Sequence, residues 1–133
     1  MSVSAKTSSA ARILMESEAQ AILAAAQRID AQLPAAVDLI RSTPGKLIVT
    51  GIGKSGHLAR QLAATLQSTG TPAVFLHPAE ATHGDLGICQ PGDAVLMISK
   101  SGSTAELLQL VPSLSQHKLI RSEEHTSELQ SLA

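Results

Sequence analysis

The chain has 133 residues, enough for one domain with a modest core. Its formal net charge is −1, so the composition carries no electrostatic footprint for nucleic acid or an anionic membrane. Phe75 is the only aromatic residue, and Cys89 is the only cysteine, which excludes an internal disulfide. A single cysteine, with no signal-peptide pattern and no membrane-spanning apolar run, predicts a cytoplasmic protein in which Cys89 packs as a small hydrophobe.

Residues 1–42 are expected to form two helices, which either pack on the domain that follows or contact a second copy of the chain. The first helix is capped by Ser8 or Ser9 and runs to about Leu33, and the second covers 35–42. An apolar stripe on the first helix consists of Ile22, Ala26, Ile29 and Leu33.

Residues 43–120 alternate between strand and helix patterns, which predicts parallel strands joined by right-handed crossovers. The expected fold class is therefore α/β, a three-layer α-β-α sandwich around a parallel sheet. Strands are expected at 46–50, 73–76, 94–98 and from 118, and helices at 55–67 and 103–116.

The apolar spacing predicts which side of each helix faces the sheet. The residues expected to face inward are Leu58, Leu62 and Leu66 in the first helix and Leu107, Val111 and Leu114 in the second. Gly70 is expected to end the first helix in a left-handed conformation. Pro112 should bend the second, because it removes one backbone donor.

The alternation stops after Ile120. Residues 121–131 have no strand character, and they resemble, residue for residue, the translation of a common sequencing-library adapter. Residues 121–133 are therefore expected to be an artefactual, non-native tail. The natural sequence is expected to continue past Ile120, so the domain is expected to be incomplete at its C-terminus.

The stretch 47–57 joins an apolar, β-branched strand to a helix through three glycines, a lysine and a serine. This pattern is typical of a loop that brings a phosphate to the amino end of a helix. A P-loop would need a glycine where the chain has Ile48. A dinucleotide-binding loop has three glycines at this spacing, but the second expected strand ends in His77 rather than in the acid that holds a ribose.

A second hydroxyl-rich loop follows the third expected strand. Residues 99–106 read Ser-Lys-Ser-Gly-Ser-Thr-Ala-Glu, and hydroxyls around a glycine can surround a phosphate. The alternative is a helix cap, since Ser103 and Glu106 have the spacing of a capping box. Ligands of open parallel sheets bind beyond the carboxyl ends of the strands, where this loop, 51–57 and 77–87 are expected to lie. The two loops rich in glycine and hydroxyl groups, 51–57 and 99–106, are expected to bind one phosphate together.

Four motifs carry a resemblance to a known family. They are Gly-Ile-Gly-Lys-Ser-Gly-His from Gly51, Ser-Thr-Gly-Thr-Pro from Ser68, His-Pro-Ala-Glu-Ala-Thr-His-Gly-Asp-Leu-Gly from His77 and Ser-Lys-Ser-Gly-Ser-Thr-Ala-Glu from Ser99. Together they resemble the sugar isomerase (SIS) domain, and specifically the arabinose 5-phosphate isomerases, over residues 13–120. The resemblance implies an isomerase that interconverts D-ribulose 5-phosphate and D-arabinose 5-phosphate, on the route to the Kdo sugar of lipopolysaccharide. It also implies a homotetramer, two CBS repeats after the SIS domain, and no organic cofactor.

By position, the resemblance implies that Lys54 and Glu106 are catalytic and that His77 can take an inhibitory zinc ion. The implied substrate contacts are Ser55, Gly70, Thr71, His83, Ser99, Ser101 and Thr104. The family's usual Ser-Asn-Ser-Gly-Glu appears here as Ser-Lys-Ser-Gly-Ser, so Lys100 and Ser103 replace an amide and an acid. Two further family residues fall beyond Ile120, so these 133 residues alone are expected to have little or no activity.

The residue types suit isomerisation, which moves a proton between adjacent carbons through an enediol. Lys54 would hold the developing oxyanion, and the base would be either Glu106 or a residue beyond Ile120. The alternatives are that Lys54 only neutralises phosphate, that Glu106 only caps its helix, and that His83 only holds its loop. A zinc site at His77 and His83 lacks a third ligand at the usual spacing. The alternative function is a non-catalytic, sugar-phosphate-binding regulatory domain, although residues 1–42 carry no basic helix-turn-helix.

Overall fold

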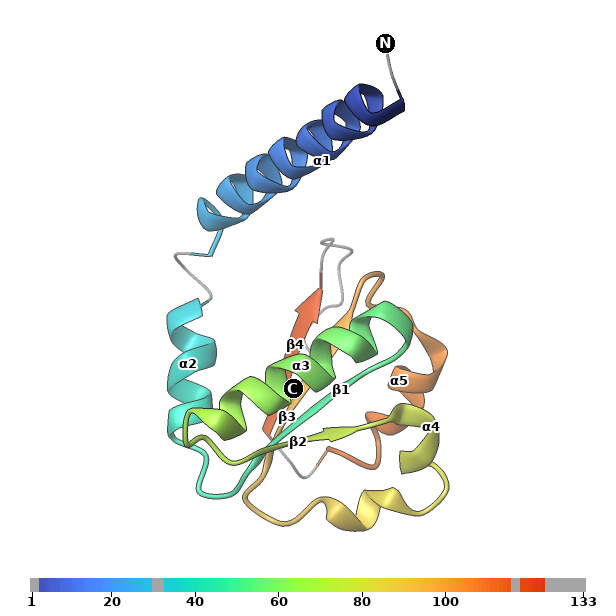
Figure 1. Ribbon diagram of the computed structural model, residues 1–133. Helices are drawn as coiled ribbons and strands as arrows, with labels where there is room; N and C mark the ends of the chain where they lie inside the picture. The colour runs from blue at the N-terminus through green and yellow to red at the C-terminus, as the bar shows by residue number, and fades with distance from the viewer. Residues whose placement is uncertain (1–2, 30–32, 116–117, 124–133) are drawn as a thin grey trace. The chain divides into compact units, whose positions relative to one another are not determined.

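The computed structural model describes residues 3–29, 33–115 and 118–123 (Figure 1). The chain divides into two compact units, Met1–Leu39 and Ile40–Ala133. None of the helices in the described ranges is both long enough and apolar enough to cross a membrane.

The amino-terminal unit contains α1 (Val3–Ala26) and most of α2 (Leu33–Arg41). α1 begins five residues before the predicted cap at Ser8, because solvent can satisfy the first N–H groups of an exposed helix without a side-chain cap. It ends at Ala26, so the predicted stripe through Ile29 does not lie on one helix. The large apolar side chains of α1 that are exposed are Ile13, Leu14, Met15, Ile22 and Leu23. Packing of this unit on the domain or on a second copy stays a prediction.

Four parallel strands form one sheet in the order β2-β1-β3-β4 (Figure 1). β1 (Leu47–Gly51) lies between β2 (Ala73–Leu76) and β3 (Ala94–Ser99), and all three agree with prediction to within one residue. Thr50 of β1 pairs with Leu76 of β2 on one side and with Met97 of β3 on the other. The carboxyl ends of these strands therefore meet at one edge.

The fourth strand, β4 (Lys118–Glu123), extends three residues into the run that was predicted to lack strand character. Its backbone pairs with β3, with Met97 opposite Arg121 and Ser99 opposite Glu123. That prediction is wrong for 121–123. Strand pairing uses backbone N–H and C=O groups, which every residue in this run has, and the backbone of β3 is free to pair on this side. The rest of the predicted tail, 124–133, lies outside the described residues.

Helices cover both faces of the sheet, which gives the predicted three layers (Figure 1). α3 (Gly53–Ser68) contacts β1, β2 and β3 on one face. Three further helices follow in the described part of the chain. α4 (Pro78–Ala81) and the 3-10 helix η1 (Asp85–Ile88) connect β2 to β3, and α5 (Ala105–Leu110) connects β3 to β4. Side chains alternate between faces along a strand. The buried cluster on the α5 face consists of Ile48, Leu76, Ala81, Val95, Met97, Leu107, Leu110 and Leu114.

α3 packs on the sheet through small residues rather than through the predicted leucines. Gly56, Ala59 and Ala63 are buried, whereas Leu58 is 58% exposed. The other two leucines predicted to face inward on this helix are only half-buried. The helix lies so close to β1 that a Cβ on Gly56 would be 2.7 Å from the Gly51 carbonyl oxygen. The prediction for Leu58 is wrong because a helix this close to the sheet can turn only small residues toward it.

α5 is shorter than the helix predicted for 103–116. It ends at Leu110 and continues as turns to residue 115, because Pro112 has no N–H to donate to the helix. Leu107 and Leu114 are buried and Val111 is half-buried against the core, as predicted.

An ion pair lies at the amino edge of the sheet, opposite the carboxyl ends of the strands. The Lys46 ammonium is 2.5 Å from Asp93, and the backbone N–H groups of Lys46 and Gln90 also donate to this carboxylate. Burial acts to raise the pKa of Asp93, but these hydrogen bonds and the lysine charge together hold that pKa below its ordinary value. Burial and then the charge of Asp93 raise the pKa of the nearby Cys89 thiol, which packs against the core as predicted.

Gly56→Ala should destabilise the domain by about 1–3 kcal/mol, because the added methyl must displace the Gly51 backbone. Gly87→Ala is the matched control: a Cβ there meets no heavy atom within 4 Å, and we expect a change within about 0.5 kcal/mol. Urea denaturation measures both. Equal midpoints would show that α3 does not approach β1 this closely.

Asp93→Asn should cost about 1–3 kcal/mol, because it weakens three hydrogen bonds to a buried acceptor. The stabilisation from this carboxylate is present above the ordinary Asp pKa of about 4 and is lost as pH falls through the lower folded-state pKa. The variant should therefore lose less stability than the wild type in urea unfolding repeated from about pH 6 to about pH 3. Asp85→Asn, at an exposed position, is the control. If wild type and Asp93→Asn lose stability in parallel, other carboxylates set the acid sensitivity.

Candidate functional site

β1 and β3 are neighbours at the point where the strand order of the sheet changes direction. β1 leads through α3 to β2 on one side, whereas β3 leads through α5 to β4 on the other. In open parallel sheets, ligands bind beyond the carboxyl ends of two such strands. Gly51 of β1 pairs with Ile98 of β3, so the loops that follow these strands start side by side.

The loop after β1 brings backbone N–H groups to this edge. Gly53 has φ +58°, a conformation that residues with a Cβ rarely adopt. α3 begins there, with Ile52 as its N-cap and no side-chain hydrogen bond to the cap. The N–H groups of the first helical turn, which include those of Lys54 and Ser55, therefore have no acceptor within the helix, and an anion suits them.

The loop after β3 is held closed by its own hydroxyl groups. Ser99 is buried, shares a 3.0 Å hydrogen bond with the Thr104 hydroxyl and accepts the Gly102 N–H at 3.1 Å. The Ser103 hydroxyl donates to the Ser101 hydroxyl at 3.2 Å, and both of these side chains are exposed. Ser99 and Thr104 thus shape the loop, while Ser101 is accessible to a ligand.

The capping-box alternative for Glu106 is wrong. The N-cap of α5 is Thr104 rather than Ser103, and the Thr104 side chain makes no capping hydrogen bond to the first turn of the helix. Ser103 is engaged by Ser101 instead. Glu106 lies exposed in the first turn of α5, and its carboxylate makes no hydrogen bond or ion pair with any residue in the described ranges.

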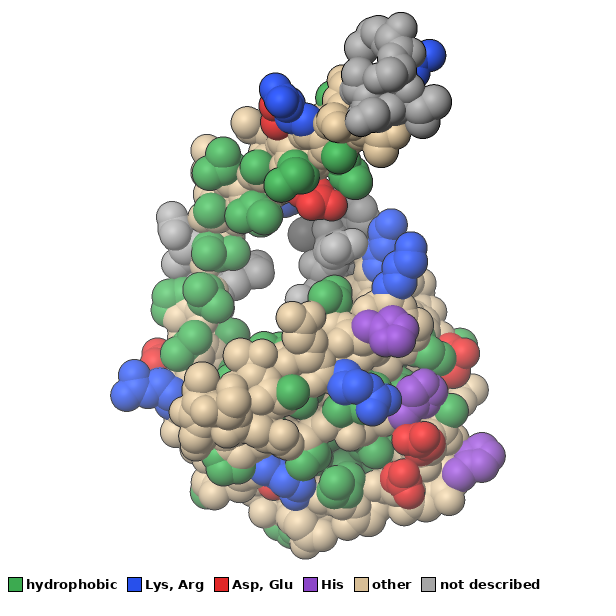
Figure 2. Space-filling view, viewed as in Figure 1, with side chains coloured by type: hydrophobic (Ala, Val, Ile, Leu, Met, Phe, Trp, Pro, Cys, Tyr) green, Lys and Arg blue, Asp and Glu red, His purple; other side chains and the backbone are tan. Residues whose placement is uncertain are grey.

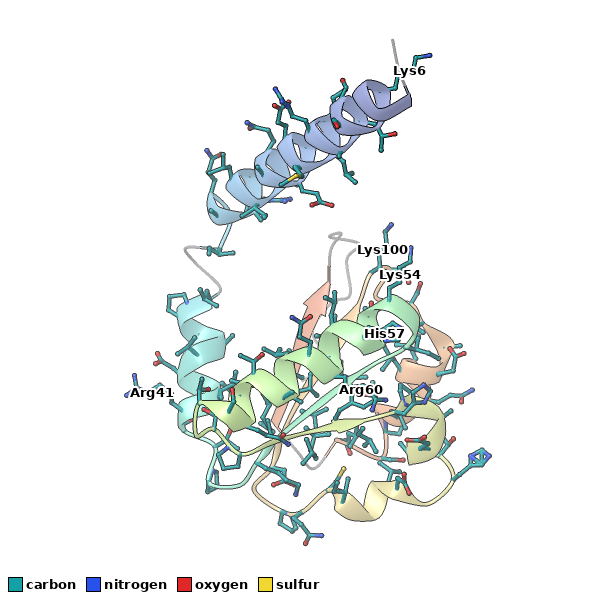
Figure 3. All side chains as sticks on the ribbon, viewed as in Figure 1. Lys6, Arg41, Lys54, His57, Arg60 and Lys100 are labelled. Atoms are coloured by element: carbon teal, nitrogen blue, oxygen red, sulfur yellow. The ribbon has the colours of Figure 1, made fainter. Side chains whose placement is uncertain are left out.

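Two lysines bring positive charge to the same edge. Lys54 is the second residue of α3, and Lys100 directly follows β3. Both are exposed, and neither forms an ion pair within the part of the chain that the structure describes. Figure 3 shows both side chains extending from the same end of the domain, with His57 one turn further along α3. In the space-filling view, basic side chains and a histidine lie over α3, and histidines with acidic side chains beside them lie over the region of α4 (Figure 2). A bound anion would neutralise this field.

The two histidines after β2 have different surroundings. His77 is half-buried and caps α4, with its Nδ1 accepting the Ala79 N–H at 3.2 Å. His83 is exposed, and its Nδ1 lies 3.2 Å from the Thr82 hydroxyl. Over the described ranges, no cluster of three or more His, Cys, Asp or Glu side chains could hold a metal ion. Zinc binding at His77 stays a prediction.

Gly70 and Thr71 lie at the opposite edge of the sheet from these loops. Gly70, at φ +88°, follows the end of α3 in the predicted left-handed conformation, and Thr71 comes just before β2. Within one chain they therefore do not join Lys54, Ser55 or Ser101. Their role as substrate contacts stays a prediction.

Sequence reasoning missed a contact between Arg60 of α3 and Phe75 of β2. The guanidinium carbon lies 4.4 Å from the centre of the Phe75 ring. The Phe75 ring in turn meets the His77 ring edge-on, with 6.2 Å between centroids. The only sequence signal was that Phe75 is the sole aromatic residue and stands two positions before His77.

These features define an open α/β domain with a candidate small-anion site at a topological switch point. β2 is followed by His77 rather than by an acid, which agrees with the argument against a dinucleotide. Residues 39–120, more than half of the chain, match the SIS domain family, and the chain belongs to that family.

Several relatives carry a more specific name. Arabinose 5-phosphate isomerase KpsF of Escherichia coli is 56% identical over 78 residues, which are 59% of this chain and 25% of KpsF. Arabinose 5-phosphate isomerase KdsD of Yersinia pestis is 43% identical over 111 residues, which are 84% of this chain and 34% of KdsD. The structure of an E. coli CFT073 protein in complex with A5P is similar with a TM-score of 0.87 and 38% identity, covering 92% of this chain and 66% of that protein. The chain thus spans about a quarter to a third of the length of the curated relatives it matches.

Proposed function

We propose that the full-length protein is a cytoplasmic aldose–ketose isomerase that interconverts D-ribulose 5-phosphate and D-arabinose 5-phosphate, in the supply of Kdo for lipopolysaccharide. One observation carries this proposal: the adjacent parallel strands β1 and β3 each end in a loop that contains glycine, a hydroxyl group and an exposed lysine. The relatives named arabinose 5-phosphate isomerase and the structural neighbour in complex with A5P support the same assignment.

The phosphate of the substrate would bind between the two loops. The first N–H groups of α3 and the Ser55 hydroxyl would donate from one side, and Ser101 from the other. Ser99 and Thr104 would keep the second loop in shape through their mutual hydrogen bond. A dianionic phosphate also offsets the charges of Lys54 and Lys100.

The chemistry would move one proton between adjacent carbons and a second proton between the oxygens that these carbons carry, with no net change in oxidation state. Glu106 would remove the proton from the carbon beside the carbonyl, forming an enediolate, and would return it to the neighbouring carbon. Lys54 would hold the oxyanion that develops. The scheme needs no organic cofactor, and both residues follow strands that end at the same edge.

The proposal concerns the complete gene product, assembled as a homo-oligomer. We expect these 133 residues alone to show little or no turnover. A sugar-phosphate-binding regulatory domain would bind the same ligand without turning it over, so an assay of the complete gene product with arabinose 5-phosphate separates the two functions.

Lys54→Ala in the complete gene product should lower kcat/KM by about 10²–10³-fold, because one donor to the oxyanion is lost. Production of ribulose 5-phosphate from arabinose 5-phosphate measures the effect. Lys6→Ala, an exposed lysine of α1, is the control and should match the wild type. If Lys54→Ala keeps normal turnover, Lys54 has no catalytic role.

Lys100→Gln should raise KM by about 2–10-fold and leave kcat within about twofold, because it removes a charge that attracts the phosphate but does not act on the reacting carbons. The variant should also show a smaller rise in KM with added salt than the wild type. Arg41→Gln, at an exposed position of α2, is the charge-matched control. A fall in kcat with unchanged KM would contradict a role in phosphate attraction alone.

A further inference from the structure

Three side chains form a stack that begins on α3 and ends at the carboxyl edge of β2. Arg60 places its guanidinium carbon 4.4 Å from the Phe75 ring centre, and Figure 3 shows it two turns along α3 from the Lys54 end. The Phe75 ring then contacts the His77 ring edge-on, at 6.2 Å between centroids and 76° between planes. Cation–π and edge-to-face contacts of this kind favour one ring orientation.

A hydrogen bond fixes the remaining freedom of the His77 ring. The Ala79 N–H donates to His77 Nδ1 at 3.2 Å. A ring nitrogen that accepts a hydrogen bond carries no proton, so the neutral imidazole has its proton on Nε2. Because Leu76 pairs with Thr50, His77 comes directly after the carboxyl end of β2 and beside the loop that follows β1.

We infer that Arg60 and Phe75 are positioning residues for His77, which is presented at the strand ends as a neutral Nε2–H donor to an oxygen of the bound sugar phosphate. The donor role rests on the proposed function, whereas the positioning does not. A neutral donor complements the two lysines, because it adds a directed hydrogen bond without adding charge.

The same geometry does not fit the zinc role that the resemblance implies for His77. A neutral imidazole has one unprotonated nitrogen, and here that nitrogen already accepts the Ala79 N–H. Zinc at Nε2 would require the proton to move to Nδ1, which would break the hydrogen bond that caps α4. The described residues also supply no set of three candidate ligands. Zinc and the helix cap thus compete for one lone pair.

The tautomer of His77 can be read without substrate, by NMR of histidine-labelled full-length protein at about pH 8, where an ordinary imidazole is neutral. We expect one tautomer in the wild type, with the proton on Nε2. Phe75→Leu and Arg60→Gln should each introduce a second tautomer, because the ring is then free to turn away from Ala79. Arg12→Gln, which removes an exposed arginine of α1, is the matched control.

His77→Asn keeps a side chain that caps helices well, so it should fold with stability close to the wild type while lacking the ring. Both tautomers in the wild type, or spectra of Phe75→Leu and Arg60→Gln that match the control, would overturn the positioning role.

Added arabinose 5-phosphate should shift the Nε2 signal of wild-type His77, and an unchanged signal would overturn the donor role. Failure of the proposed function is a separate result, seen as binding without turnover or as no binding at any loop. Zinc chloride should move the His77 and Ala79 signals together, and a shift of His77 alone would overturn the competition between zinc and the cap.

Discussion

The close contact between α3 and β1 is the constraint on which the site depends. A Cβ on Gly56 would be 2.7 Å from the Gly51 carbonyl oxygen, so only glycine allows the helix to begin this near the strand end. With Gly53 at φ +58°, the chain turns within two residues of β1 and directs the first N–H groups of α3 to the edge of the sheet. The three glycines of one short motif therefore set both how closely α3 packs on β1 and where its first N–H groups point.

Charge is distributed unequally between the two edges of the sheet. At the amino edge, Lys46 is neutralised by the buried Asp93, which also ties two backbone N–H groups to the turn before β3. At the carboxyl edge, Lys54 and Lys100 are exposed and have no acidic partner in the described ranges. The paired edge stabilises the fold, and the unpaired edge keeps a positive field that a phosphate can neutralise. Such a division is expected where a parallel sheet places its ligand beyond the carboxyl ends of its strands.

Features that depend on local sequence patterns were predicted correctly. Features that depend on the distance between helices and strands were not. β1, β2 and β3 were predicted to within one residue, because each is a short apolar run bounded by glycine or proline turns. The buried face of α3 was predicted wrongly, since the leucine spacing carries no information about how close the helix lies to the sheet. The capping box was wrong because Ser103 has a competing partner in Ser101. The Arg60, Phe75 and His77 stack joins separate elements and leaves no periodic signal in the sequence.

The central claim is that one phosphate contacts the loops after β1 and β3 together. A titration of the isotope-labelled protein with arabinose 5-phosphate, followed through the backbone amides, tests it most directly, with unphosphorylated arabinose as the control. The account predicts that the Ser55 and Ser101 amide signals shift with one shared Kd and that arabinose shifts neither. A response in only one loop, two different Kd values, or equal shifts with arabinose would contradict it.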